Sequence, residues 1–124
     1  MQWKEEYALG VEFMDRTHRE FVDLLGATAA LNGAEFEASF ALLIEHTKAH
    51  FAAEREKMEQ LKLSSMREHI DEHEKLLSEM SFFIKKPLMS KHYVSDRLPE
   101  WFALHAASMD AALASAIKER DHKP

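Results

Sequence analysis

Five histidines and two carboxylates are the residues of this chain with the clearest capacity for chemistry. They occur as His50-x-x-x-Glu54, His69-x-x-x-His73 and His105-x-x-x-x-Asp110, with His18 upstream. Side chains four residues apart lie on one face of a helix, one turn from each other. Four helices that each direct such ligands inward would enclose a pair of metal ions, so the spacing predicts a di-metal site.

The donor set narrows the metals that would suit this site. Imidazole and carboxylate ligands fit iron, manganese, zinc or nickel, whereas calcium and similar ions prefer oxygen alone. The chain has no cysteine, which excludes thiolate ligands and disulfides. A single tetrahedral zinc uses about four ligands. Two metals that share the carboxylates as bridges would use all seven candidates and neutralise carboxylates set among apolar residues.

Each candidate ligand also has a simpler interpretation when it is taken alone. A lone histidine on an apolar helix face is more often a hydrogen-bonded core residue than a ligand. Glu54 is followed by the charged run Arg55 to Lys57, and acidic residues surround the His69 and His73 pair, as on a solvated face. Their joint placement at comparable depth in antiparallel helices favours the metal site.

Three further histidines are not needed by a complete seven-ligand set. His46 lies one turn before His50 on the same face, and we interpret it as a supporting or packing residue. We expect His92 in a connector and His122 near the C-terminus to be solvated.

The apolar pattern predicts four helices to position these ligands. Residues 3–14 read as an N-terminal arm broken at Gly10, with Asp15 as the N-cap of a first helix that stops at Asn32-Gly33. A second helix is expected over residues 34–62. Its inner face would carry Phe36, Phe40, Leu43, Thr47, His50, Glu54, Met58 and Leu61.

The second half of the chain continues the same pattern. Ser65-x-x-Glu68 is a capping box that would start a third helix, and Pro87 would mark its end. Residues 88–94 are predicted to be a connector, with a fourth helix from Ser95 or Asp96. The inner face of that helix would carry Leu98, Trp101, Phe102, His105, Met109 and Ala112.

Residues 1–124 are therefore predicted to form a single all-α domain, an up-down-up-down antiparallel four-helix bundle with an N-terminal arm. One spacing conflicts with regular helix geometry. Residues five apart are about 140° apart around an α-helix, so His105 and Asp110 could not both point inward. We predict a π-type widening there, a feature often found at functional sites.

Composition restricts the class of partner. The net charge of −6 argues against nucleic acid, and the basic clusters are too short for a membrane-binding patch. No apolar run approaches the roughly 20 residues of a membrane span. The start of the chain lacks the apolar stretch of a signal peptide, so a cytoplasmic protein with no membrane association is expected.

The combined pattern resembles the hemerythrin family, in its bacterial branch, over nearly the whole chain. The matching segments are Trp3-x-x-x-Tyr7-x-Leu9-Gly10-Val11, Asp15-x-x-His18, His50-Phe51-x-x-Glu54-x-x-x-Met58, His69-x-x-x-His73 and Trp101-x-x-x-His105-x-x-x-x-Asp110. Together these motifs are highly specific.

The resemblance implies two non-heme iron ions with an oxo or hydroxo bridge. His69, His73 and His105 would hold one iron, His18 and His50 the other, and Glu54 and Asp110 would bridge both. The iron with two histidines would keep an open position for dioxygen, or for azide and similar small anions as analogues. The implied ligand pocket is Phe21, Phe51, Trp101, Phe102, Ala106 and Met109.

Three positions depart from the usual family pattern. Arg55 replaces a common acidic residue and is expected to be exposed. Phe102 stands where the family usually has leucine, and Ala106 where it has a larger aliphatic residue. We interpret the latter two as a volume-conserving exchange, of the kind that cores tolerate, that could reshape access to the open iron.

Several functions remain open at this point. The leading hypothesis is reversible dioxygen binding for storage, delivery or sensing. The alternative is a di-iron enzyme with peroxidase, oxidase or nitric-oxide-handling activity, which would need an external electron donor. A signalling module and a bundle with a structural zinc are less favoured, and the sequence does not define the oligomeric state.

Overall fold

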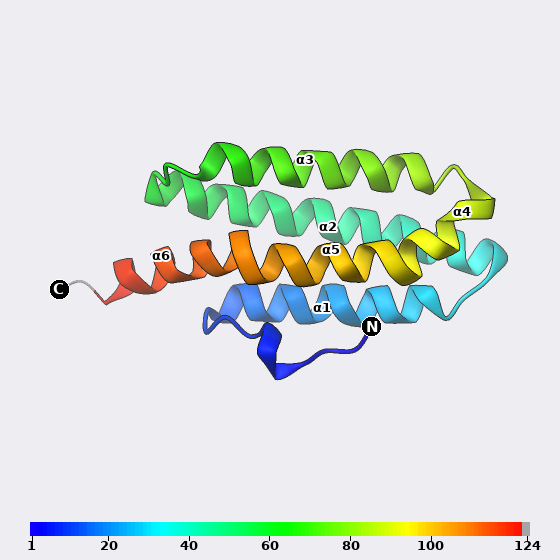
Figure 1. Cartoon of the computed structure of the whole chain (residues 1–124), viewed down its shortest axis with the longest axis horizontal. Helices are drawn as coiled ribbons and strands as arrows, with labels where there is room; N and C mark the ends of the chain where they lie inside the picture. Colours follow the sequence, from blue (N-terminus) through cyan, green and yellow to red (C-terminus); the bar gives the residue numbers. More distant parts are fainter. Residues whose placement is uncertain (123–124) are drawn as a thin grey trace.

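The computed structural model describes residues 1–122, and all the regular structure in this part of the chain is helical. Three long helices, α1, α2 and α3, lie side by side with a fourth helical run that contains α4, α5 and α6 (Figure 1). The chain is therefore a helical bundle. Within residues 1–122, no helix combines the length and apolarity that crossing a bilayer requires.

Helix α1 (Glu12–Ala29) starts earlier than predicted, and Asp15 is not its N-cap. Val11 holds that position without a side-chain cap. The Asp15 carboxylate instead accepts the backbone N–H groups of Leu9 (2.7 Å) and Gly10 (3.1 Å). It thereby closes the turn into the helix, where Gly10 has a φ of +80° that only glycine adopts readily.

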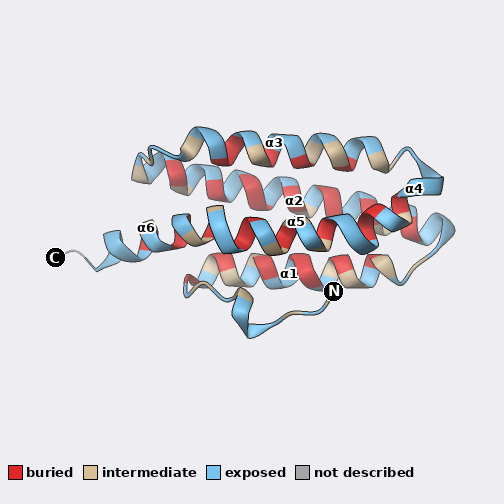
Figure 2. Cartoon of the chain, in the orientation of Figure 1, coloured by how far each residue is buried: buried red, intermediate tan, exposed pale blue. Residues whose placement is uncertain are grey.

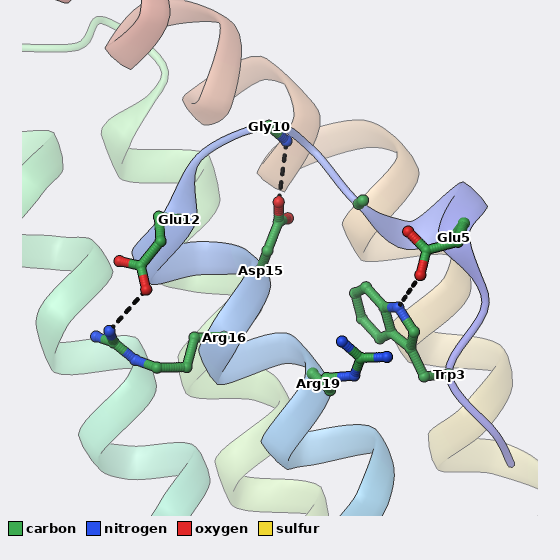
Figure 3. A pocket seen from close by; sticks show the side chains of 8 residues that line it. Trp3, Glu5, Gly10, Glu12, Asp15, Arg16 and Arg19 are labelled. Carbon is green, nitrogen blue, oxygen red and sulfur yellow. Dashed lines mark hydrogen bonds and ion pairs between the residues drawn. The ribbon is translucent and has the colours of Figure 1, made fainter.

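The segment before α1 folds back along the bundle. It contains the short 3₁₀ helix η1 (Glu5–Tyr7), and Trp3 and Tyr7 pack partly buried against the core. Trp3 donates its indole N–H to Glu5 (3.3 Å), and the guanidinium of Arg19 lies 5.4 Å from the Trp3 ring centroid. This segment and the first turns of α1 line a surface cleft of about 550 Å³ (Figure 3).

Helices α2 (Gly33–Leu61) and α3 (Met66–Phe83) lie close to their predicted positions. Lys62 ends α2 in the left-handed conformation, with a φ of +53°. The capping box predicted at Ser65 is wrong in its chemistry, because Ser65 occupies the N-cap position but makes no side-chain cap bond. Its carbonyl accepts the N–H of His69 in the ordinary helical way (3.2 Å).

The predicted connector over residues 88–94 is wrong. Pro87 is the first residue of helix α4 (Pro87–His92). Its missing N–H is tolerated there because N–H groups in the first turn have no partner within the helix. A π turn, η2 (Tyr93–Arg97), then leads directly into α5 (Leu98–His105). The fourth helical run is thus longer than its amphipathic pattern indicated.

The predicted irregularity between His105 and Asp110 is confirmed. A second π turn, η3 (Ala106–Asp110), separates α5 from α6 (Ala111–Asp121). This wider turn shifts the register of the buried face by one residue. Ala112, predicted to face inward, is consequently exposed, and Leu113 and Ala114 are buried in its place.

Buried residues recur along each long helix between exposed ones (Figure 2). They divide into two apolar clusters. The larger contains Phe21, Leu25, Phe40, Leu43, Met80, Tyr93, Leu98 and Phe102 among others. The smaller contains Val11, Met14, Met58, Ile70, Leu113, Ala114 and Ile117.

Candidate metal centre

All seven predicted ligands are buried and come from every long helical element. Glu54 is 0% exposed, His18 and Asp110 are 1% exposed, and the other four are no more than 7% exposed. α1 supplies His18, α2 supplies His50 and Glu54, α3 supplies His69 and His73, and the α5–η3 junction supplies His105 and Asp110. Burial of so many ionisable groups is costly unless they are paired or bound to a cation.

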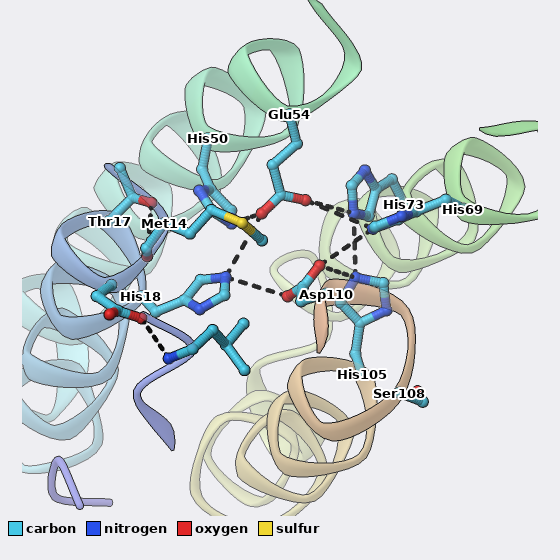
Figure 4. A network of polar contacts seen from close by, with 12 residues as sticks. Met14, Thr17, His18, His50, Glu54, His69, His73, His105, Ser108 and Asp110 are labelled. Carbon is cyan, nitrogen blue, oxygen red and sulfur yellow. Dashed lines mark hydrogen bonds and ion pairs between the residues drawn. The ribbon is translucent and has the colours of Figure 1, made fainter. Parts of the chain in front are cut away.

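The two carboxylates lie at the centre of the cluster and divide the histidines into two sets (Figure 4). Glu54 Oε1 lies 3.3 Å from His73 Nε2, and Asp110 Oδ1 lies 3.1 Å from both His69 Nε2 and His105 Nε2. One oxygen of each carboxylate therefore faces the set of three histidines.

The other oxygen of each carboxylate faces the remaining pair. Glu54 Oε2 lies 2.8 Å from His50 Nε2, and Asp110 Oδ2 lies 3.0 Å from His18 Nε2. The donor atoms thus converge on two points, one within a group of five residues and one within a group of four, and the groups share Glu54 and Asp110. This is the arrangement that two bridged metal ions require.

The histidines and the two carboxylates of the cluster shift one another's pKa values. Burial lowers the pKa of His18 and of His69, but contacts with Asp110 and Glu54 outweigh it and raise both to about 9. Burial alone would raise the pKa of Glu54 and of Asp110, but the neighbouring histidines hold both well below their usual range. Burial lowers the pKa of His73, which favours its neutral form.

The hydrogen-bond geometry tests whether these residues fit a metal. Both Glu54 oxygens and His18 Nε2 are buried, and none of them forms a well-aligned hydrogen bond within the described chain. Their oppositely charged neighbours nevertheless lie only 2.8–3.5 Å away. The Nε2 atoms of His73 and His105 face each other at 3.1 Å. Buried polar groups normally have a partner. A cation at each point of convergence would supply it, so the donor set fits metal ions.

Aromatic rings hold several ligand imidazoles in place. Phe51 stacks on His73 with centroids 3.6 Å apart and planes 2° apart, and Trp101 stacks on His105 at 4.4 Å and 14°. The rings of Phe102 and His18 pack edge to face, with their centroids 5.4 Å apart. Sequence reasoning assigned these rings to a ligand pocket and missed their contact with the ligands, although the four-residue spacing of Trp101 and His105 was a signal for it.

A small apolar cavity adjoins the four-residue group. Its volume is about 10 Å³, and it is lined by His18, Phe21, His50, Phe51, Trp101, Phe102, His105 and Asp110. Four of the six predicted pocket residues are in this lining. Ala106 is buried and Met109 is half-buried, but neither lines the cavity, so this part of the predicted pocket is wrong.

The remaining histidines lie outside both donor groups. His46 is half-buried, its Nε2 lies 3.6 Å from Glu20 Oε1, and it belongs to neither donor group of the described residues. His92 is exposed and pairs with Asp96 at 2.7 Å, and His122 is exposed. Arg55 is also exposed, where it pairs with Glu59 at 3.1 Å.

One curated protein resembles this chain along most of its length. The chain is 30% identical over 125 residues to a protein named Bacteriohemerythrin from Ralstonia nicotianae (strain ATCC BAA-1114 / GMI1000). The alignment covers 97% of this chain and 90% of that protein. Searches against family models and against solved structures gave no match.

Proposed function

The chain belongs to the hemerythrin-like family, and from that premise we propose that it is a di-iron protein that binds dioxygen reversibly beside one of its two metal positions. His69, His73 and His105 would hold one iron, and His18 and His50 the other. Glu54 and Asp110 would bridge the two ions, together with an oxo or hydroxo group. When bound, the two iron ions supply the dioxygen-binding chemistry itself.

The division of the carboxylate oxygens between the two histidine sets carries this proposal. A single metal would draw ligands to one point, whereas Glu54 and Asp110 each direct one oxygen to the three-histidine set and one to the two-histidine set. The second set has one histidine fewer and lies beside the cavity. The open position is therefore expected there.

The residues around the cavity would favour reversible binding of dioxygen over its irreversible release in reduced form. Phe21, Phe51, Trp101 and Phe102 cover the site with aromatic surface and exclude water from it. The lining contains no acid or base other than the ligands. Irreversible loss of reduced oxygen needs protons, so a dry lining without a proton donor slows it.

The fold that holds this centre completes the proposal. We infer an up-down-up-down antiparallel bundle in which residues 1–124 act as one domain, with the N-terminal segment as an arm against α1. The direction of the sequence colours along α1, α2 and α3 supports this topology (Figure 1).

The test is a spectrum of the purified protein as oxygen is admitted and removed. The reduced protein is prepared without oxygen, exposed to air and returned to vacuum, and iron per chain is measured in parallel. About two irons per chain, the number that two bridged positions require, and a visible band that appears with oxygen and fades under vacuum are expected. Azide added to the oxidised protein should produce a separate band by occupying the same position.

Other results would contradict parts of the proposal. Two irons with only irreversible oxidation would favour the di-iron enzyme, which steady-state assays with hydrogen peroxide or nitric oxide would then define. An iron content near zero with full occupancy by zinc would reject the iron assignment and leave a structural metal.

A further inference from the structure

A second feature of the molecule lies at the corner between α3 and α4, well separated in sequence from every metal ligand. Five large apolar side chains are exposed among the described residues, and three of them fall here: Phe82 at 52%, Leu88 at 100% and Met89 at 50%. Single exposed apolar residues are ordinary, but a cluster of them marks an interaction site.

Two of these side chains, Leu88 and Met89, line a hollow of about 410 Å³, which we call the α4 hollow. Its lining is Phe83, Leu88, Met89, His92, Tyr93 and Arg97. Its floor is rigid, because the Phe83 and Tyr93 rings stack at 4.2 Å and 17° and Tyr93 is only 1% exposed. A preformed apolar hollow of this kind receives side chains without reorganisation of the protein.

The charge around the α4 hollow is opposite to that of the whole chain. The chain carries a net charge of −6, yet residues 79–97 contain the basic residues Lys85, Lys86, Lys91 and Arg97 against two acidic residues, Glu79 and Asp96. Both acidic residues are already paired, Glu79 with Arg97 at 3.8 Å and Asp96 with His92 at 2.7 Å. The Lys91 ammonium group donates hydrogen bonds to the carbonyls of Ala29 (2.7 Å) and Leu31 (2.6 Å). Lys85 and Lys86 are exposed and form no ion pair within the described residues.

These observations select one kind of occupant. We propose that the α4 hollow docks an acidic amphipathic helix of a partner protein, with apolar side chains in the hollow and carboxylates toward Lys85 and Lys86. This mode places residues spaced along one helix face into an apolar groove. Charge complementarity would mainly fix partner choice and speed association.

Two other occupants fit the observations less well. A symmetric pair of this chain would bring the patch that contains Lys85 and Lys86 against the same basic patch of the other copy, because such an interface uses one patch twice. A lipid surface would accept protruding apolar residues, but it gives no reason for a concave hollow with a stacked aromatic floor. The proposal is independent of dioxygen binding, because no ligand residue lines the hollow.

The first experiment titrates the full-length protein with two synthetic helical peptides and follows methyl resonances by NMR. The peptides share one apolar pattern of leucine and phenylalanine, with glutamate at the polar positions of one and lysine at those of the other. The acidic peptide is expected to shift the Met89 and Leu88 methyl signals and to bind at least about tenfold more tightly than the basic one. Added salt should weaken its binding.

Matched variants separate the hollow from general apolar surface. Leu88→Ser should reduce binding of the acidic peptide by about tenfold or more, as removal of a central apolar contact does. Leu104→Ser, at a residue 66% exposed on α5, should leave it unchanged. Leu88 is fully exposed, so its variant should keep the circular dichroism spectrum and the metal content of the parent.

Three results would overturn the proposal. Equal binding of both peptides would show non-selective apolar contact. Self-association that sedimentation detects in the parent and not in Leu88→Ser would assign the hollow to a second copy. Binding to vesicles containing phosphatidylglycerol, lost in Leu88→Ser and without a response to the acidic peptide, would assign it to a membrane surface.

Discussion

At the scale of single residues, Glu54 connects the two halves of the donor cluster. Its Oε2 lies 2.8 Å from His50 Nε2 and its Oε1 lies 3.3 Å from His73 Nε2. Glu54→Gln keeps the shape of the side chain but removes the charge that both proposed metal positions would share. We expect the affinity for metal to fall by at least about tenfold, a loss typical even of weaker supporting contacts. Competition with a coloured chelator measures it, and retention of full affinity would remove Glu54 from the centre.

Glu56→Gln is the matched control for this substitution. Glu56 lies on the same helix but is exposed, so its loss should leave metal affinity unchanged. An equal effect of the two substitutions would mean that only the net charge of the chain matters.

The pKa values of His18 and His69 predict how the metal-free protein responds to pH. Both are raised from 6.5 to about 9, since Asp110 and Glu54 outweigh the effect of burial. A pKa raised on folding stabilises the protein fully below the unfolded value, and this stability is lost as pH rises through the folded value. The melting temperature of the metal-free protein should therefore fall between about pH 6.5 and pH 9.

Metal-loaded protein provides the comparison, because bound metal replaces those protons. Its melting temperature should change much less over the same pH range. A metal-free melting temperature that does not fall between about pH 6.5 and pH 9 would contradict the raised pKa values of His18 and His69, because the lowered pKa of His73 affects stability only below about pH 6.5.

At the scale of elements, the π turn η3 determines which side chains face the core. Ala106 and Ala107 are neighbours in this turn, but Ala106 is 2% exposed and Ala107 is exposed. Ala106→Ile inserts three carbon atoms into a packed interior and should cost about 1–3 kcal/mol of stability. Ala107→Ile should change it by less than about 0.5 kcal/mol. Urea unfolding of both variants measures the difference, and equal midpoints would contradict the packing of η3.

The turn before α1 offers a second test at this scale. Asp15 accepts two backbone N–H groups, from Leu9 and Gly10 (Figure 3 shows the bond to Gly10). Asp15→Asn should cost about 1 kcal/mol, the usual effect of weakening such a charged acceptor at a helix start. In a Trp101→Phe background, Trp3 fluorescence should also shift toward that of solvent-exposed indole.

Asp23→Asn serves as the control, because Asp23 is an exposed residue on the same helix. If it lowers stability as much as Asp15→Asn, the contacts to Leu9 and Gly10 contribute nothing specific.

These elements also show what could be predicted from the sequence. The ligand spacing within α2 and α3 is a local property of a helix, so the pattern placed those side chains on one face, and the structure brings all seven candidates together. The five-residue spacing of His105 and Asp110 is also a local property, so its conflict with regular helix geometry could be recognised from the sequence. The sequence did not show that Met109 and Ala112 would turn away from the predicted inner face. Such a register shift can be worked out only once the position of the wider turn is known.

The helix over Pro87–His92 was missed for a different reason. Its six residues are too few for an amphipathic period, and a proline at its start was taken as the end of the helix before it. Its stability comes from tertiary contacts, including the bonds from Lys91 to carbonyls at the end of α1. Contacts of this range leave no local signal in the sequence.

At the scale of the whole molecule, the proposed metal ligands come from four separate helical elements that fold together. Ions that bind this arrangement and not the unfolded chain will stabilise it, by about 4 kcal/mol at a thousandfold excess over the dissociation constant. Calorimetry before and after chelation should show a clear fall in melting temperature. Metal added back should restore it, and an unchanged melting temperature would place any bound metal outside the cluster.

The division of the apolar interior into two clusters has a consequence for how this protein opens. The smaller cluster holds the beginning of α1 and the end of α2 against α3 and α6, and it is separate from the larger cluster. Regions of this kind open as separate cooperative units. In the metal-free protein, amides around Met58 and Leu113 should exchange with solvent sooner than those around Phe40 and Leu98. Bound metal would then link the helices that carry the two clusters, so that both clusters open together.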